Sequence, residues 1–318
     1  MIETVAGPVP AEDLGPTLMH EHIFVLNREL EANYPGRWDQ AERVADAVAK
    51  LRAAAESGIR TIVDLTVLGL GRDVPLVQEV AAQVDLHVVV ATGLYSFDDV
   101  PMFFKFRGPG LLIDGPELMT EFFVRDLTKG VADTGVKAAI IKCATDKAGV
   151  TPGVDRILRA VSRAHLETGA PITTHTDAGT RRGLDQLAIF REEGVDLTRV
   201  VIGHCGDTTD TDYLRELMDA GCTIGMDRFG MELLLPFAQR IDTVARLCAQ
   251  GYADRMVLSH DASCFTHNFD PEVKQRVMPD WVYTHLQQDV VPALRAAGIS
   301  AEQIDQMLIH NPSRVLSR

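Results

Sequence analysis

The chain lacks an excess of positive charge and any long hydrophobic run. Its 31 Lys and Arg residues are outnumbered by 45 Asp and Glu residues, which gives a net charge of −14, and the longest basic run is Arg181-Arg182. A surface this acidic repels nucleic-acid phosphates and anionic lipid headgroups. No apolar stretch approaches the roughly 18 residues of a membrane-spanning helix. We therefore expect neither nucleic acid nor a membrane as a partner.

Cysteine is scarce and shows no pairing pattern. The five cysteines are an odd number, are widely spaced and form no CxxC pair, which is typical of reduced thiols. Residues 1–6 show neither the basic nor the apolar part of a signal peptide. We expect a cytoplasmic protein in which Cys143 and Cys205 are core thiols. Cys264 is expected in a loop, as the one thiol open to oxidation.

Phosphate-binding and serine-nucleophile motifs are also missing. The sequence contains no GxGxxG and no GxxxxGK[ST] turn, and a tight turn explains Gly69-Leu70-Gly71. An open, doubly wound sheet is disfavoured, because its first turn usually carries such a motif. The absence of a GxSxG elbow argues against a serine hydrolase.

The chain does contain an eightfold alternation of strand-like and helix-like segments. Short runs rich in apolar and β-branched residues are separated by amphipathic stretches such as 41–57, 154–168 and 211–220. Eight strands that alternate with helices predict an α/β protein, a (β/α)8 TIM barrel formed by a single domain over residues 1–318. The eight runs lie at 17–23, 61–66, 86–93, 137–144, 171–176, 200–205, 222–227 and 256–261.

Polar and charged residues recur at the carboxyl ends of these runs. In a βα barrel those ends converge on one face, where active sites form. His20 and His22 are two residues apart, so both side chains can face the barrel axis while Glu21 points away. His260 should likewise point away from the axis. The residues expected at this face are His20, His22, Lys142, His175, His204, Asp227, Arg228 and Asp261.

Several imidazoles and a carboxylate on one rim indicate a metal site. A single histidine on a strand is usually an ordinary hydrogen-bonded residue. Chance placement explains poorly why four of them stand at the same level of separate strands. Neutral imidazole nitrogens and carboxylate oxygens are suitable ligands for Zn²⁺ and related ions. The sequence therefore predicts a metal site that includes His20, His22, His175 and His204, with His260 beside it rather than a ligand.

Lys142 is unusual among histidines of this kind. Its ammonium would repel cations, so one interpretation is that the amine reaches solvent or pairs with a carboxylate. The other is that burial lowers the pKa of Lys142 until the free amine reacts with CO₂. The resulting carbamate is a bidentate anion able to bridge two metal ions about 3.5–4 Å apart. The residues alone leave both interpretations open.

An ordered set of motifs runs from about Gly7 to Ser313. The motifs are GPTLMHEH at 15–22, DLTVLGLGR at 64–72, ATGLY at 91–95, Lys142, TH at 174–175, IGH at 202–204, DRFG at 227–230 and LSHD at 258–261. Together they resemble the phosphotriesterase family of the amidohydrolase superfamily, and more narrowly its phosphotriesterase-like lactonase branch.

The resemblance implies a centre with two divalent metal ions. N6-carboxylysine at Lys142 and a hydroxide would bridge the ions. The metal would be Zn²⁺, or alternatively Co²⁺, Mn²⁺ or Fe, since all of these accept nitrogen and oxygen ligands. The implied ligands are His20, His22 and Asp261 for one ion and His175 and His204 for the other.

The resemblance also implies substrate contacts and a partner. Tyr95 and Arg228 would line the substrate pocket. Residues 262–281 would form a long loop that shapes an acyl-chain channel, although this chain lacks the Trp that several relatives carry near Asn268. The family implies a homodimer.

The predicted activity is that of a metal-dependent lactonase acting on a small-molecule lactone. The expected substrates are N-acyl homoserine lactones, whose hydrolysis would quench quorum signals, with weaker phosphotriesterase activity. A metal-bridging hydroxide would attack the carbonyl, and Asp261 would accept its proton and pass it to the leaving alkoxide. Lys142, Tyr95 and Arg228 complete the expected catalytic set. The alternatives are phosphotriesterase (aryldialkylphosphatase) as the main activity, or a non-catalytic metal-binding or ligand-binding barrel.

Overall fold

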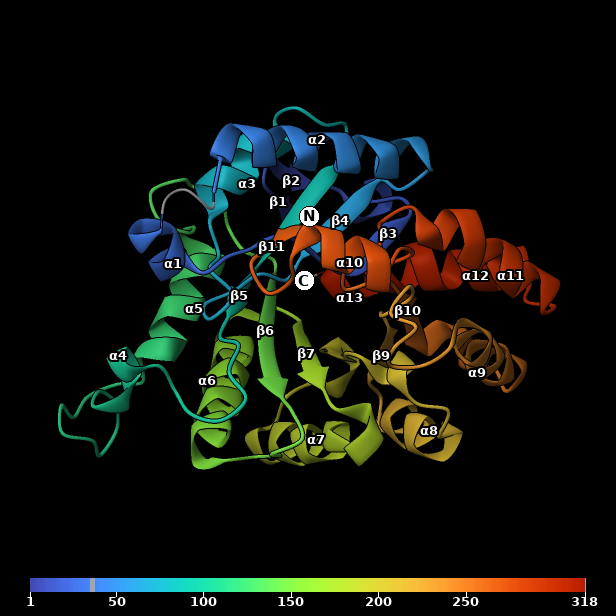
Figure 1. Cartoon of the computed structure of the whole chain (residues 1–318). Helices are drawn as coiled ribbons and strands as arrows, with labels where there is room; N and C mark the ends of the chain where they lie inside the picture. Colours follow the sequence, from blue (N-terminus) through green and yellow to red (C-terminus); the bar gives the residue numbers. More distant parts are fainter. Residues whose placement is uncertain (35–37, 318) are drawn as a thin grey trace.

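Eight parallel strands, from β3 to β10, form the centre of the molecule, and each pairs with the next along the chain (Figure 1). The computed structural model describes residues 1–34 and 38–317. The parallel sheet and its surrounding helices confirm the predicted TIM barrel. The strands are β3 (Thr17–Val25), β4 (Thr61–Asp64), β5 (His87–Gly93), β6 (Ile140–Thr145), β7 (Ile172–Thr176), β8 (Val200–Ile202), β9 (Thr223–Met226) and β10 (Met256–Leu258).

A further strand, β11 (Ser263–Thr266), pairs in parallel with β3 at the other edge of the sheet. The sequence predicts one continuous strand over 256–261, but β10 ends at Leu258 and pairing resumes only in β11. Asp261 interrupts the strand because its φ of 58° is left-handed, while its N–H donates to the His20 carbonyl. The eighth barrel strand is therefore two short pieces with Asp261 between them.

Helices cover the outside of the barrel (Figure 1). The three predicted amphipathic stretches form α2 (Gln40–Glu56), α6 (Pro152–Thr168) and α8 (Thr211–Asp219). Within the described residues, no helix is long and apolar enough to cross a membrane. The other helices are α1 (Arg28–Asn33), α3 (Val74–Ala81), α4 (Met102–Lys105), α5 (Leu118–Thr128), α7 (Arg182–Glu193), α9 (Phe237–Ala249), α10 (Pro271–Val277), α11 (Val291–Ala296), α12 (Ala301–Asp305) and α13 (Asn311–Leu316).

Alternation along the strands separates two layers of buried side chains. On β5, Val88 packs with the residues of the helices, whereas Val89 belongs to the layer that fills the barrel interior. On β6, Ile140 is in the interior layer, so Lys142, two residues later, faces the same way at the carboxyl end. The interior layer is completed near the chain ends by Ile2, Leu14, Val315 and Leu316. A short hairpin of β1 (Ile2–Thr4) and β2 (Gly7–Val9) precedes the barrel.

The cysteines are free thiols and all five are buried. Cys143 and Cys205 pack in the layer between strands and helices, which confirms their prediction as core residues. The prediction for Cys264 is wrong, because this residue lies in β11, is only 3% exposed and packs in the same layer.

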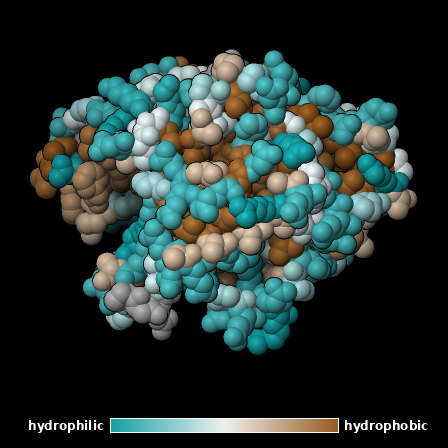
Figure 2. Space-filling view, turned by 90° about the horizontal axis from the view of Figure 1, so that it is seen from above, coloured by the Kyte–Doolittle hydropathy of each residue, from teal (hydrophilic) through white to brown (hydrophobic). Residues whose placement is uncertain are grey.

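The segment between β5 and α5 projects from the barrel (Figure 1). It contains α4 and leaves neighbouring large apolar side chains exposed to solvent. Figure 2 shows hydrophobic residues at the left edge of the molecule, where this segment lies. Contiguous exposed apolar surface of this kind usually marks an interaction site. We refer to it as the α4 patch, defined as Met102, Phe103, Phe106, Leu112 and Ile113.

Candidate metal centre

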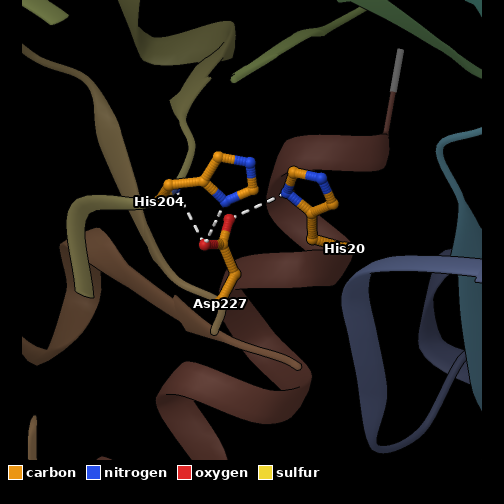
Figure 3. A group of neighbouring side chains, drawn as sticks. All are labelled: His20, His204 and Asp227. Carbon is orange, nitrogen blue, oxygen red and sulfur yellow. Dashed lines mark hydrogen bonds and ion pairs between the residues drawn. The ribbon is translucent and has the colours of Figure 1, made fainter. Parts of the chain in front are cut away.

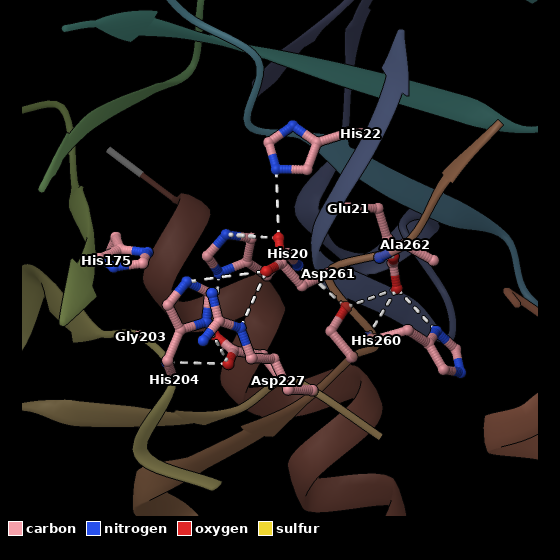
Figure 4. Close-up of polar contacts among 12 residues, drawn as sticks. His20, Glu21, His22, His175, Gly203, His204, Asp227, His260, Asp261 and Ala262 are labelled. Atoms are coloured by element: carbon pink, nitrogen blue, oxygen red, sulfur yellow. Dashed lines mark hydrogen bonds and ion pairs between the residues drawn. The ribbon is translucent and has the colours of Figure 1, made fainter. Parts of the chain in front are cut away.

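The carboxyl end of β3 and the interrupted eighth strand bring three of the predicted ligands together. Asp261 Oδ1 lies 3.2 Å from His22 Nε2 and 3.5 Å from His20 Nε2. In Figure 4 both imidazoles face this carboxylate, while Glu21 points the opposite way. One donor atom from each of the three residues lies within 4.8 Å of the others. Two imidazole nitrogens and a carboxylate oxygen fit a divalent cation, so this trio is a candidate metal-binding group.

Asp227, which follows β9, is hydrogen-bonded to the rings of both His20 and His204 (Figure 3). One carboxylate oxygen accepts a hydrogen bond from His20 Nδ1 at 2.8 Å, and the other accepts one from His204 Nδ1 at 3.0 Å. The Nε2 atoms of both rings face Asp261, at 3.5 and 3.8 Å. A carboxylate in this position fixes the tautomer and orientation of metal-binding imidazoles. The sequence placed Asp227 at a strand end but could not reveal this shared contact.

Lys142 lies buried among these residues and does not reach solvent. It is 1% exposed, and its Nζ is 2.7 Å from His20 Nε2 and 3.4 Å from the Thr174 carbonyl. Burial lowers the pKa of Lys142 to about 8, although the negative charge of Asp261 acts to raise it. Burial, with the repulsion of Lys142, lowers the pKa of His20 to about 4. The interpretation in which the Lys142 amine escapes to solvent is therefore wrong.

His175, on β7, lies beside His204, with 4.6 Å between the ring centroids. Its Nδ1 accepts the Tyr95 hydroxyl at 3.2 Å, and its Nε2 donates to Asp146 at 3.2 Å. This hydrogen bond is the main reason why the pKa of Asp146 falls to about 2. Burial raises the pKa of Tyr95, so its phenol remains a donor. Both ring nitrogens of His175 are thus engaged. Sequence reasoning did not identify Asp146, because no motif marks it.

Arg228 links the predicted ligand Asp261 to a series of buried charged side chains. Its Nε donates to Asp261 at 3.0 Å, and a terminal nitrogen donates to Asp207 at 2.9 Å. Asp207 also pairs with Arg240 of α9 at 2.8 Å. Burial opposes the charges of Arg228 and Asp261, yet the carboxylates hold the pKa of Arg228 above its usual value. The nearby imidazoles and the Arg228 guanidinium hold the pKa of Asp261 well below the usual value of an aspartate. The sequence identified Arg228 but neither Asp207 nor Arg240.

Glu21 holds the interruption in the eighth strand. One carboxylate oxygen accepts the Ser259 hydroxyl and the N–H and Nδ1 of His260, and the other accepts the Ala262 N–H. His260 therefore points away from the barrel axis, as predicted (Figure 4). Four hydrogen bonds to one buried carboxylate offset its desolvation and stabilise the left-handed backbone at Asp261.

A cavity of about 180 Å³ is lined by five of the six predicted ligands, namely His20, His22, Lys142, His204 and Asp261. Tyr95 and Arg228 contribute polar groups to its wall. Residues 262–281, predicted as a loop, contain β11 and α10, and Phe269 and Trp281 from this segment reach the cavity. The apolar part of the wall is formed by Val25, Leu70, Met231, Phe269 and Trp281.

A parallel βα barrel with imidazoles, a carboxylate and a buried lysine at the carboxyl ends of its strands defines a barrel-type, metal-dependent hydrolase. Residues 1–316 match the phosphotriesterase family. The chain is 55% identical to the phosphotriesterase homology protein of Mycobacterium tuberculosis (strain H37Rv), over all of this chain and 98% of that protein. It is 35% identical to the aryldialkylphosphatase of Saccharolobus solfataricus, over 97% of each.

The fold has a close counterpart among solved structures. The structure of the phosphotriesterase from Mycobacterium tuberculosis matches with a TM-score of 0.98 and 55% identity, covering all of this chain and 98% of that one. The chain therefore belongs to the phosphotriesterase family, a family of binuclear metal-dependent hydrolases, as its motifs predicted.

Proposed function

We propose that this family member is a lactonase that hydrolyses N-acyl homoserine lactones and so quenches quorum signals. The observation that carries the proposal is the placement of Tyr95 and Arg228, each in contact with a predicted metal ligand. A protonated phenol and a guanidinium can donate hydrogen bonds to the oxygens of a lactone ester. The apolar wall that includes Leu70, Met231 and Phe269 suits an acyl chain.

The proposed centre holds two divalent ions, with Zn²⁺ as the first choice and Co²⁺, Mn²⁺ or Fe as the others. The donor chemistry fits, because a buried imidazole such as that of His20 is neutral near pH 7. For His175, binding an ion requires that one ring nitrogen leave its present hydrogen bond. The proposed ligands are His20, His22 and Asp261 for one ion and His175 and His204 for the other, with Lys142 shared between them.

Lys142 is proposed to carry the bridge as a carbamate. The ammonium first loses one proton. The neutral amine nitrogen then forms a bond to the carbon of CO₂ and loses a second proton to the surroundings as one C=O bond opens to an oxyanion, so that a cation becomes an anion. The burial of Lys142 and its 2.7 Å contact with His20 Nε2 support this assignment, since an ammonium there would oppose any cation. Mass spectrometry of the native protein would detect the added CO₂.

In the proposed mechanism, the residues named above would hold divalent ions, whose chemistry there would be to polarise the ester carbonyl and to lower the pKa of water toward neutrality. Asp261 accepts the proton of the attacking water and then donates it to the alkoxide that leaves when the ring C–O bond breaks. Arg228 orients the Asp261 carboxylate through its hydrogen bond. Tyr95 donates its one O–H to His175 in this structure, and it would donate that O–H to the substrate once the hydrogen bond to His175 is released.

The test compares kcat/KM for N-decanoyl homoserine lactone and paraoxon on one metal-loaded preparation. We expect a lactone preference of about 100-fold or more, which is about 2.7 kcal/mol of transition-state stabilisation. Tyr95→Phe should lower kcat/KM for the lactone more than kcat/KM for paraoxon, because the Tyr95 hydroxyl is proposed to act only in lactone hydrolysis.

Phosphotriester hydrolysis as the main activity is the second candidate, and the identity to a protein named aryldialkylphosphatase favours it. The same nucleophile and polarising ion would serve a P=O centre. A reversed ratio in the kcat/KM comparison would select this candidate. Activity on neither substrate would reject both.

We also propose that the enzyme is a cytoplasmic homodimer that uses the α4 patch as its interface. The support is the exposure of adjacent apolar residues, with Met102 at 68% and Leu112 at 85%. Leu112→Asp combined with Met102→Asp should convert the dimer to a monomer in light scattering, because buried charges oppose association. Leu166→Asp, at another exposed apolar residue, is the control and should leave the dimer intact. A parent protein that is monomeric would contradict the proposal.

A further inference from the structure

His175 differs from another predicted histidine ligand, His20, in how its ring is held. In His20, Nδ1 donates to a carboxylate and Nε2 faces Asp261. In His175 both ring nitrogens are hydrogen-bonded instead, Nε2 to Asp146 and Nδ1 to the Tyr95 hydroxyl, each at 3.2 Å. One of these two hydrogen bonds must therefore open before the ring can bind an ion.

The two hydrogen bonds of His175 are of unequal strength. Asp146 is a carboxylate, and a hydrogen bond to an ionised acceptor is about twice as strong as one between neutral groups. The Tyr95 phenol is a neutral donor, and it belongs to the wall of the cavity that the predicted ligands line, whereas Asp146 lies outside that wall. The hydrogen bond to Tyr95 is therefore the easier one to break.

The loop between β6 and α6 holds the Asp146 carboxylate in place. Its Oδ1 accepts the Lys147 N–H, and its Oδ2 contacts His175. The Asp146 carbonyl accepts the Gly149 N–H at 2.8 Å, which closes a tight turn. Arg182 of α7 donates to the Lys147 carbonyl at 2.8 Å, and its guanidinium packs against Gly149, where a Cβ would lie only 2.9 Å from it. The turn and the guanidinium therefore position the carboxylate without help from the other predicted ligands.

We propose that Asp146 is a positioning residue for the metal centre: it holds the Nε2–H of His175, so that Nδ1 is the atom presented to an ion when the Tyr95 hydroxyl moves away. A carboxylate that accepts the second N–H of a ligating imidazole fixes the tautomer and orientation of the ring and makes its other nitrogen more basic. Ligation at Nδ1 would also remove the acceptor of the Tyr95 hydroxyl, which would then be free to bind a substrate oxygen. The inference rests on the proposed two-ion centre and names the group that prepares one of its ligands.

Titration of the chelator-treated chain with Co²⁺ against a competing chelator, followed by visible absorption, tests the proposal. We expect two binding steps in the parent. Asp146→Ala should weaken one step by about 10–100-fold, the usual effect of removing such a partner, and leave the other within about three-fold of the parent. Asp146→Asn should fall between the two, because its amide oxygen accepts the N–H but carries no charge. Asp133→Asn, at an exposed carboxylate between α5 and β6, is the matched control and should bind both ions as the parent does.

Tyr95→Phe distinguishes the two ring nitrogens of His175. Because this change removes the hydroxyl that occupies Nδ1, the step that depends on Asp146 should keep its affinity or gain some. If Nε2 were the ligand atom instead, Asp146→Ala would tighten Co²⁺ binding, and that result would overturn the proposal. A larger loss of affinity in Tyr95→Phe than in Asp146→Ala would overturn it as well.

The Tm of the metal-free protein separates this role from a merely structural one. Asp146 is 28% exposed, and such ion pairs contribute little to stability, so the Tm of metal-free Asp146→Ala should stay within about 2 °C of the parent. A larger fall in Tm together with the loss of both ions would show that Asp146 only supports the fold, and would overturn the proposal.

The same titration distinguishes failure of this inference from failure of the proposed function. A parent chain that binds no Co²⁺ would overturn the two-ion centre together with this inference. Parent-like affinity for both ions in Asp146→Ala would overturn this inference alone. Because no substrate enters the measurement, the absence of lactonase activity would leave the role of Asp146 intact.

Discussion

At the scale of single residues, Asp261 combines several constraints. Its carboxylate faces His20 and His22, and Arg228 donates to it from the other side. Its backbone is left-handed, a conformation that costs a non-glycine residue about 1–2 kcal/mol. The hydrogen bonds of Glu21 to the residues on either side offset that cost. Such strain beside ionisable groups is typical of a position retained for chemistry.

Asp261→Asn tests the proposed proton transfer at this residue. An amide cannot accept the proton, so kcat should fall by about 10²–10⁴-fold, the usual contribution of a general base. Metal content by mass spectrometry would show how much of the loss arises from weaker ion binding. Asp289→Asn, an exposed carboxylate far along the chain, is the matched control and should retain activity. Unchanged kcat in the Asp261→Asn variant would exclude the proposed proton transfer by Asp261.

At the scale of elements, the site depends on how closely β5 and β6 approach. Gly93, the last residue of β5, pairs with Lys142 of β6. A Cβ at Gly93 would lie 1.9 Å from the Lys142 carbonyl oxygen, and the φ of 134° also favours glycine. The strand backbone that carries Lys142 is therefore positioned by the absence of a side chain on its neighbour.

Gly93→Ala should force the two strands apart. We expect it to lower the free energy of unfolding by at least about 3 kcal/mol, because a backbone clash adds to the strained φ. Gly169→Ala provides the control: this glycine has a φ of 70° at the end of α6 but open space around it. It should cost only about 1–2 kcal/mol, measured by urea unfolding of both variants. Equal costs would show that the close approach does not matter.

At the scale of the whole molecule, the centre gathers side chains from strands spread around the barrel. Its residues come from β3, β6, β7, the ends of β8 and β9, and the interruption after β10. Imidazoles and carboxylates buried in this way lose their contact with water, a cost that a bound cation would compensate. Ion binding in such a centre should therefore stabilise the entire barrel rather than one segment.

Chelation should expose this coupling. With the free ion about 1,000 times above its Kd, binding contributes about 4 kcal/mol. For a chain of 318 residues, with an unfolding entropy of about 2.1 cal/mol/K per residue, removing the ion should lower Tm by about 6 °C. Hydrolytic activity should disappear with the chelator and return when Zn²⁺, Co²⁺ or Mn²⁺ is added. Scanning calorimetry of the native, chelated and reloaded protein measures both effects. A Tm and an activity that do not respond to the chelator would contradict a metal centre.

The sequence by itself determined the barrel and the positions of most groups at its rim. Hydrophobic periodicity is a local property, so eight strands and the helices between them could be read from neighbouring residues. Alternation of strand side chains then placed His20 and His22 on the axis side and Glu21 and His260 away from it. The ordered motifs supplied the family.

Only the tertiary structure decided which distant groups meet. Glu21 reaches Ser259 across 238 positions of the chain, and Asp227 joins His20 to His204, contacts that no local pattern encodes. The interruption at Asp261 and the burial of Cys264 likewise depend on how β11 and α10 pack against the barrel. Side-chain packing between remote segments sets these features, because each depends on the simultaneous position of several elements, whereas strand formation depends mainly on one.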